Sequence, residues 1–396
     1  MEESLKKRDV LIVTRERIEV SQFAGPNMEA WFSRQPEDEG WDAFLQSTPL
    51  GQYQQSSMWA RAKATEGWSV VRLLLTAEEE IIGGFQVLYK FSWWGGIGYV
   101  SKGPVMQQTS ELSAGLALDL LQRACTRLRL RALVVQLPDE CEDGPWGLAG
   151  RGFLNYTAGK VIESTWLIGL GSKRGGMDRA MTANTRREAR QAIRRGVSVR
   201  QGKREDLPVF FEMMRSSCRR QKTMPNPGDV AFLYSLWDTS EPRNCIRLFL
   251  AEYEGVPLGG LMCIPFGRIM YAWKKGWSEA GSAHRPNELL NYDCLKWSAE
   301  NGFDSVDFGA FDDEMALALL RGKPISEECK ASRHFFNVRF GGRPVILPPA
   351  MIYIPNPLLR LAYRIVFSRK LRKAVERRRE MDAVRRESFG RSEAAV

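Results

Sequence analysis

The chain has 396 residues, of which 44% are hydrophobic and 26% charged, and its formal net charge is +10. This length favours two domains, and the composition is that of a globular protein with ample material for a core. The positive charge favours an anionic partner, such as nucleic acid, a phosphorylated small molecule or an acidic membrane surface, and does not choose among them.

Several residue counts exclude other classes of protein. The seven cysteines are odd in number and show no CxxC spacing, which is typical of a reduced cytoplasmic protein without a disulfide framework. The chain has only two histidines, His284 and His334, so a histidine-rich metal site is excluded. Its first ten residues lack the apolar stretch of a signal peptide, and no apolar run approaches the roughly 20 residues needed to span a bilayer.

In chain order, the first half of the sequence predicts an α/β pattern after a polar segment at residues 1–25. Trp59 and Lys63 are four residues apart, so they share one face of a predicted helix. The expected elements are a strand at 10–13, helices at 41–45, 56–65 and 112–129, and strands at 70–75, 81–89, 97–100 and 133–136.

The second half repeats this order of elements. A pair of glycines lies early in the second hairpin strand of each half, at Gly83-Gly84 and at Gly259-Gly260. This weak internal duplication predicts a first module at residues 26–160 and a second at 161–350. The expected elements are strands at 165–170, 247–253, 258–265, 269–274 and 305–308 and helices at 182–195, 209–222 and 288–300.

The predicted helix that begins near Thr182 carries most of the arginines around this junction. Thr182 or Asn184 can cap its start, and Gly196 can end it in the left-handed conformation. A charged helix of this kind is either a solvated face or a site for an anion, and its place at a domain junction favours the anion. The expected apolar stripe consists of Ala183, Ala189, Ala192 and Ile193.

The C-terminal region, residues 351–396, differs in composition from the rest. Prolines mark an extended linker, and residues 358–386 are predicted to be helical. Between Arg360 and Arg391 there are twelve Lys or Arg against four Asp or Glu. A basic amphipathic helix suits an anionic membrane surface, so such a surface is a candidate partner for residues 358–391. A solvated tail is the equal alternative.

Five motifs spread over roughly residues 40 to 350 are informative together. They are QSSMWARAKATEGW, YVSKGPV, TRREARQAIRRGVSV, RPNELLNYDCLKWSAENGFDSVDFGAFD and FFNVRFGGRPV. In this order they resemble the motifs of the FemABX family of peptidoglycan-bridge aminoacyltransferases and of the related FemAB-like acyltransferases. The resemblance implies an α/β (α+β) fold of two tandem GNAT-like (acetyltransferase-like) modules with mixed, mainly antiparallel sheets. It also implies that the last strands pack back onto the first module.

The first module holds four candidate substrate-binding residues, of which the resemblance implies the role of Lys63. Lys63 matches the family lysine that grips the substrate phosphate, and a compact ammonium suits that role. Lys102 lies on a Gly-Pro turn at a strand end, where α/β modules carry sites, although simple turn chemistry explains it equally well. Trp59 and Tyr99 are interpreted as cleft wall or core.

In the second module Arg186 and Arg190 fall on the motif and can bind a diphosphate bidentately. Asp307, at the end of a buried strand, is the acid/base candidate, although such an aspartate can equally cap the following turn. His284 and Glu288 are further acid/base candidates, and a capping role for Asn287 and Glu288 is the preferred alternative.

Phe336 and Asn337 occupy the F-K position of the closing motif and are also assigned to the catalytic set. Asn337 replaces a lysine that belongs to the active site of the tRNA-dependent members, which questions tRNA use unless Arg333 or Arg339 compensates. The usual GNAT pyrophosphate loop is also missing, so the sequence does not support an ordinary acetyl-CoA site.

We therefore expect a cytoplasmic acyl- or aminoacyltransferase, peripheral at the inner face of the membrane, that forms an amide on an amine of a phosphorylated or lipid-linked cell-envelope precursor. The donor is either aminoacyl-tRNA or acyl-CoA, no cofactor or metal is bound, and tRNA is a candidate partner. One alternative is a CoA-dependent GNAT-type N-acyltransferase in exopolysaccharide or amino-sugar modification. The other is a non-enzymatic RNA- or membrane-surface-binding module.

Overall fold

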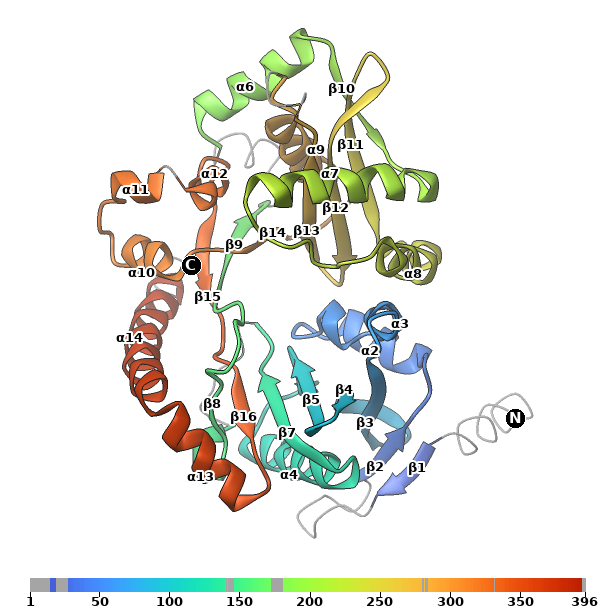
Figure 1. Cartoon of the computed structure of the whole chain (residues 1–396), viewed down its shortest axis with the longest axis vertical. Coiled ribbons are helices and arrows are strands. Elements are labelled where there is room, and N and C mark those ends of the chain that lie inside the picture. The colour runs from blue at the N-terminus through green and yellow to red at the C-terminus, as the bar shows by residue number, and fades with distance from the viewer. Residues whose placement is uncertain are drawn as a thin grey trace, which may run out of the picture. The chain divides into compact units, whose positions relative to one another are not determined.

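The computed structural model describes residues 15–18, 28–139, 141, 146–171, 181–279, 281, 284–330 and 332–393, so the strand predicted at 10–13 lies outside the described residues. The chain divides into two compact units. Unit 1 comprises Met1–Val161 and Leu347–Ala383, and unit 2 comprises Ile162–Ile346 and Val384–Val396. Each unit is built around one mixed sheet (Figure 1).

The described part of unit 1 contains a nine-stranded sheet in the order β1-β2-β3-β4-β5-β7-β16-β8, with β6 paired to β4. β5 and β7 are parallel, and the other neighbours are antiparallel. The strands are β1 (Arg15–Ile18), β2 (Met28–Ser33), β3 (Ser69–Ala77), β4 (Glu80–Ser92), β5 (Gly95–Ser101), β6 (Val105–Met106), β7 (Leu130–Gln136), β8 (Leu154–Asn155) and β16 (Met351–Tyr353).

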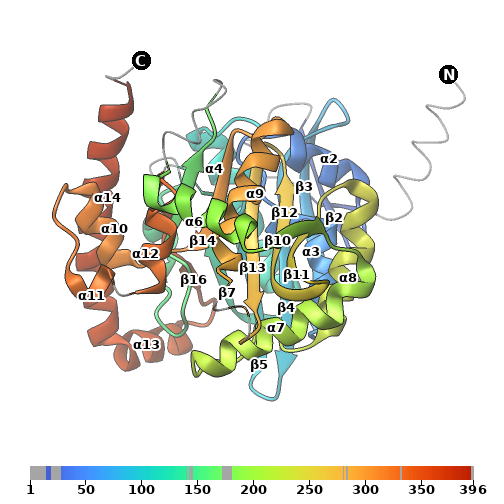
Figure 2. The same ribbon diagram turned by 90° about the horizontal axis from the view of Figure 1, so that it is seen from above.

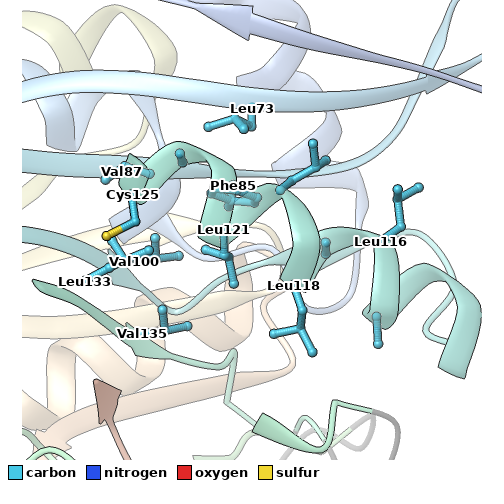
Figure 3. Packing of buried hydrophobic residues seen from close by; sticks show 14 of the residues in the cluster. Leu73, Phe85, Val87, Val100, Leu116, Leu118, Leu121, Cys125, Leu133 and Val135 are labelled. Carbon is cyan, nitrogen blue, oxygen red and sulfur yellow. The ribbon is translucent and has the colours of Figure 1, made fainter. Parts of the chain in front are cut away.

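Helix α4 (Glu111–Arg127) covers one face of this sheet and closes the core of unit 1. It begins at a capping box, in which Ser110 and Ser113 each accept the other's backbone N–H. Its apolar stripe packs onto β4, where Leu121 lies against Phe85 (Figure 3). Two further described helices, α2 (Glu39–Ser47) and α3 (Ser57–Ala64), lie between β2 and β3.

The described part of unit 2 contains a seven-stranded sheet in the order β10-β11-β12-β13-β14-β9-β15, in which only β13 and β14 are parallel. Its strands are β9 (Ser164–Gly169), β10 (Val197–Gln201), β11 (Arg247–Tyr253), β12 (Val256–Phe266), β13 (Ile269–Trp277), β14 (Ser305–Ala310) and β15 (Arg343–Ile346). Its helices are α6 (Ala183–Arg194), α7 (Leu207–Arg220), α8 (Val230–Ser240), α9 (Pro286–Glu300), α10 (Asp313–Leu320), α11 (Glu327–Lys330) and α12 (Arg333–Val338).

Two adjacent glycines show how the helices of unit 2 sandwich the sheet. A Cβ atom on Gly259 would lie 3.3 Å from Leu290 of α9, whereas one on Gly260 would lie 2.7 Å from Phe210 of α7. Because successive residues of a strand point to opposite faces, α9 and α7 cover opposite sides of the sheet (Figure 2). At Gly260 any larger side chain would collide with the α7 layer.

Each of the two sheets contains a hairpin of the kind that the sequence duplication predicts. Gly83 pairs with Leu75 on β3, Gly259 pairs with Ala251 on β11, and a register shift follows each of these two pairs. In both units the hairpin is followed by a third antiparallel strand, a helix and a parallel strand. These successions are β5-α4-β7 and β13-α9-β14. The predicted fold class, with two mixed and mainly antiparallel modules, is confirmed.

The sheet of unit 1 is completed by a strand that follows the whole of the unit 2 sheet along the chain. β16 follows β15 along the chain but lies between β7 and β8 in the sheet of unit 1. β9 follows β8 along the chain but lies between β14 and β15 in the sheet of unit 2. The sequence analysis placed residues 351–353 in a linker. They form a strand because Met351 and Ile352 are buried in the core of unit 1.

The C-terminal region forms two helices where the sequence predicted one at 358–386. These are α13 (Pro357–Val366) and α14 (Ser368–Glu393), which are separated at Phe367. Asn356 starts α13, because its side chain accepts the N–H groups of Leu358 and Leu359. Among the described residues, no helix combines the length and the apolar character needed to cross a membrane.

Candidate functional site

The arginine-rich helix α6 begins and ends where the sequence predicted. Thr182 accepts the N–H of Thr185 at 3.3 Å, and Gly196 adopts a φ of 87° after the last turn. The predicted apolar stripe was wrong at Ala183 and Ile193, which are exposed. The helix packs against α9 through a different stripe at spacings of three and four residues, formed by Thr185, Glu188, Ala189 and Ala192.

Glu188 is the charged member of that buried stripe. Arg285, at the start of α9, and Arg339, after α12, both donate hydrogen bonds to its carboxylate. Burial alone would raise the pKa of Glu188, but the charge of Arg339 and the hydrogen bonds from both arginines outweigh burial and lower it. The ionised Glu188 therefore links α6, α9 and α12 within unit 2.

Arg186 and Arg190 lie beside this linkage. Arg186 is partly buried and Arg190 is exposed. Within the part of the chain that the structure describes, neither guanidinium forms a hydrogen bond or an ion pair with another residue. By contrast, Arg187 donates to Asn184 at 2.6 Å. Two arginines one turn apart on one helix thus remain available to an anion.

Lys275 on β13 is a candidate that the sequence analysis missed. Its Nζ lies 5.0 Å from the ring centre of Phe336 and 5.9 Å from that of Phe308. Burial lowers the pKa of Lys275 to about 8. The predicted strand ended at residue 274, whereas β13 continues to Trp277. The sequence feature that could have identified Lys275 is its position between two tryptophans of a strand, Trp273 and Trp277.

Glu288 lies in the first turn of α9, and its nearby negative charge raises the pKa of Lys275. Burial raises the pKa of Glu288, and the negative charge of Glu188 adds to this effect. Among the described residues, Arg285, which precedes the first turn of α9, forms no side-chain capping hydrogen bond. In the described residues the Nδ1 atom of the other candidate, His284, is buried without a hydrogen-bond partner.

The three predicted catalytic residues of unit 2 have different surroundings. Asp307 is buried and accepts hydrogen bonds from the Thr165 hydroxyl and, at 2.6 Å, from the N–H of Gly309. This geometry matches the turn role that the sequence left open. Phe336 packs against Lys275, and Asn337, the next residue on α12, is partly buried.

In unit 1, α3 brings Trp59 and Lys63 together as predicted. The Lys63 Nζ lies 5.4 Å from the Trp59 ring centre and donates to Glu66 at 2.8 Å. The backbone N–H of Trp68 bonds to the carbonyl of Lys63, and its ring contacts Tyr99 edge-on at 5.4 Å. These residues therefore form one aromatic and basic cluster at the end of α3.

The other two predicted residues of unit 1 already have partners in the structure. Tyr99 shares a hydrogen bond of 3.2 Å with Tyr156, and burial together with this bond raises the pKa of Tyr99. Lys102 is buried and forms an ion pair with Asp139. A substrate anion would have to compete with Asp139 for Lys102, so Lys63 is the more accessible cation of the two.

The clusters differ in what they can do chemically. Unit 2 presents available arginines on α6 and, near α9, a lysine and a carboxyl group whose pKa values are shifted toward neutrality. Such groups can bind an anion and take a proton from an amine near neutral pH. The parts of the chain that are described hold no group of three or more His, Cys, Asp or Glu side chains suited to a metal ion.

Comparison with known proteins identifies two segments. Residues 37–136 match the model of the FemAB family, and residues 179–315 match the model of the acetyltransferase (GNAT) domain. The lipid II:glycine glycyltransferase of Staphylococcus saprophyticus is 23% identical over 237 residues, which are 56% of this chain and 56% of that protein. That of Staphylococcus aureus is 23% identical over 229 residues, 54% of this chain and 53% of that protein. The chain spans about half the length of these curated relatives.

Solved structures extend the likeness in fold over most of the chain. The crystal structure of FemX has a TM-score of 0.71 and 18% identity, and the match covers 89% of this chain and 99% of that one. The structure of L-PGS from Bacillus licheniformis has a TM-score of 0.52 and 14% identity, covering 86% and 98%. The resemblance to FemABX-like proteins that the motifs predicted is confirmed, with residues 37–136 matching the FemAB family and residues 179–315 the acetyltransferase (GNAT) domain.

Proposed function

We propose that this protein is an acyl- or aminoacyltransferase that forms an amide on an amine of a phosphorylated, lipid-linked cell-envelope precursor. The observation that carries the proposal is the likeness to FemX over 89% of the chain. It is supported by the relatives, whose name states that they transfer glycine to lipid II. The donor is an activated ester or thioester, that is, aminoacyl-tRNA or acyl-CoA.

The reaction needs a nucleophilic amine. Its nitrogen forms a bond to the acyl carbon, the bond from that carbon to the donor oxygen or sulfur breaks, and one proton leaves the nitrogen. We propose that the neutral amine of Lys275 accepts this proton, because its pKa of about 8 leaves it partly unprotonated near neutral pH. Glu288, which lies in the first turn of α9, keeps the protonated lysine stable by its charge.

The acceptor phosphates need cations that are not already paired. We propose that Arg186 and Arg190 of α6 in unit 2 bind them bidentately. Lys63 is a separate phosphate-binding candidate in unit 1, where it would act as a point charge. The absence of partners for the two arginines within the described residues supports their role. The ion pair between Lys63 and Glu66 is partly exposed, so an anion of higher charge can displace Glu66.

A CoA-dependent N-acyltransferase acting on an exopolysaccharide or an amino sugar is the second candidate. The match of residues 179–315 to the acetyltransferase (GNAT) domain favours it. Asn337, which stands where tRNA-dependent members have lysine, weakens the case for tRNA as donor and adds to this candidate. The proposed chemistry at the amine is the same for both donors.

The test is a donor and acceptor panel with the purified full chain. Glycyl-tRNA and acetyl-CoA are each supplied with lipid II and with free glucosamine, and products are detected by mass spectrometry. One added glycyl mass on lipid II supports the first function, and an acetyl mass on glucosamine selects the second. Binding of RNA or vesicles without transfer from either donor would overturn both and leave the non-enzymatic alternative.

The cellular location follows from the acceptor. A lipid-linked acceptor requires the protein to work at a membrane surface, so we propose a cytoplasmic protein that is peripheral at the inner face. Residues 358–391 are the proposed contact with anionic lipid, and tRNA is a partner only if it serves as donor. Fractionation of cells into membrane and supernatant, with and without a high-salt wash, tests the location.

A further inference from the structure

Helix α13 exposes a continuous apolar face. Leu358, Leu361 and Ile365 recur at spacings of three and four residues, and Val366 adjoins them. Their exposed fractions are 74%, 54%, 65% and 73%. Large aliphatic side chains grouped in this way on one helix mark an interaction surface rather than scattered surface residues.

The exposure is not the result of a loosely attached helix. The opposite side of α13 is fixed to unit 1 by Tyr363, which is buried and whose hydroxyl donates to the carbonyl of Asn155 at 3.1 Å. The same hydroxyl accepts the N–H of Thr157 at 2.8 Å. Arg360 donates to the carbonyl of Ile354 at 2.9 Å. The apolar face therefore points away from the body of unit 1.

The charged residues that adjoin this face along the chain are all of one sign. Residues 355–375 contain six Lys or Arg and no Asp or Glu. Arg364 lies on α13 between the apolar positions Leu361 and Ile365, and the next exposed cations, Arg369, Lys370, Arg372 and Lys373, begin α14. An exposed apolar face bordered only by cations complements a layer of anionic headgroups above acyl chains.

We propose that α13 is an interfacial helix that lies in the plane of an anionic lipid bilayer, with Leu358, Leu361, Ile365 and Val366 in the acyl region and the flanking cations at the headgroups. At ten residues the helix is too short to span a bilayer. A protein partner would more commonly offer mixed charges around such a face, so the uniform positive border favours lipid. The proposal depends on the surface of α13 and holds whether or not the proposed transfer reaction does.

Flotation of the full chain with vesicles tests the proposal. Vesicles of equal parts phosphatidylglycerol and phosphatidylcholine should bind the protein, and vesicles of phosphatidylcholine alone should bind it at least about tenfold more weakly. The double variant Leu361→Glu/Ile365→Glu should lose about tenfold or more of the binding to the anionic vesicles, because two charges would enter the acyl region.

The matched control is Leu112→Glu/Val256→Glu, which makes the same charge change at two exposed aliphatic residues on other elements. It should bind anionic vesicles like the unaltered chain. Equal losses in both double variants, or full binding by Leu361→Glu/Ile365→Glu, would overturn the proposal. Circular dichroism of both variants checks that unit 1 remains folded.

The fluorescence of a tryptophan variant distinguishes insertion into the bilayer from electrostatic attraction to its surface. The emission of Leu361→Trp, compared with that of the unaltered chain, should shift to the blue on addition of anionic vesicles and be quenched by lipids brominated in the acyl chain. If the protein still binds the vesicles but its emission is not quenched, the contact with lipid lies elsewhere. That result would overturn the assignment to α13. Raised salt should weaken binding while leaving the blue shift of the bound fraction unchanged.

Discussion

Lys275 and Phe336 lie against each other in unit 2, with the lysine Nζ 5.0 Å from the centre of the phenylalanine ring. The two residues come from β13 and α12 and are separated by 61 positions in sequence, from 275 to 336. The ring covers an ammonium group that burial has already made less basic.

Lys275→Met should lower kcat by about a hundredfold or more if the lysine accepts the proton of the amine. In the unaltered chain kcat should rise with pH and level off above the pKa of about 8, because the neutral amine is the active form. The pH–rate profile in the variant should lose that inflection. A variant whose profile keeps the inflection would show that another group takes the proton.

The same substitution should make the protein more stable at neutral pH. The pKa of Lys275 falls from 10.5 to about 8 on folding, so the unfolded chain holds the proton more tightly between those values. The penalty is complete below about pH 8, of order 3 kcal/mol, and vanishes above about pH 10.5. Urea unfolding at pH 7 and pH 10.5 should therefore show a gain for Lys275→Met only at pH 7. Lys274→Met, at the preceding position, is the control.

Arg190→Ala should raise the KM for the phosphorylated acceptor about tenfold and leave the KM for the donor unchanged. Lys63→Ala should act in the same direction. Arg194→Ala, on the last turn of the same helix, removes an equal charge and should have little effect. An acceptor KM that stays constant in both Arg190→Ala and Lys63→Ala would contradict the assignment of the phosphate site.

Glu188→Gln should destabilise unit 2 by about 2 kcal/mol, because it leaves Arg285 and Arg339 without the charge that they share. The pKa of Glu188 is lower in the folded chain, so its stabilisation is present above the unfolded value of 4.5 and is lost as pH falls through the folded value. Thermal unfolding at pH 7 and below pH 4 measures this. Arg187→Ala, on the exposed side of α6, should change stability by less than about 0.5 kcal/mol.

Asp307→Asn distinguishes the two roles that the sequence allowed. The amide oxygen of asparagine can still accept the N–H of Gly309, so a turn residue tolerates the change. We expect kcat to fall less than about tenfold and stability to fall by about 1 kcal/mol. A loss of kcat beyond about a hundredfold with unchanged stability would make Asp307 the acid or base instead.

The fold was largely predictable because its signals are local. The hairpins and the glycine pairs at Gly83 and Gly259 depend on neighbours within a few residues, and the structure has them where the pattern indicated. The buried side of α6 was not predictable, because Glu188 is buried only through Arg285 and Arg339, about 100 and 150 positions away. The positions of these two arginines, rather than the polarity of Glu188, determine which face of α6 is buried.

The site was less predictable than the fold for the same reason. From the sequence alone, Lys102 is interpreted as a lysine of a turn. Its ion pair with Asp139 is visible only in the structure. Lys275 lay just outside the predicted strand, which ended at Lys274, and its packing against Phe336 depends on a residue 61 positions away. Residues 351–353 are too few for the alternation of a strand to specify which sheet they join.

The late position of β16 in the sequence has a consequence for synthesis on the ribosome. β7 reaches the tunnel exit some 215 residues before β16, its antiparallel neighbour, does. Throughout that interval one edge of β7 lacks its native partner, and an unpaired edge invites association with other chains. Unit 1 is the first to be synthesised. It cannot finish folding, however, until nearly the whole protein has been made.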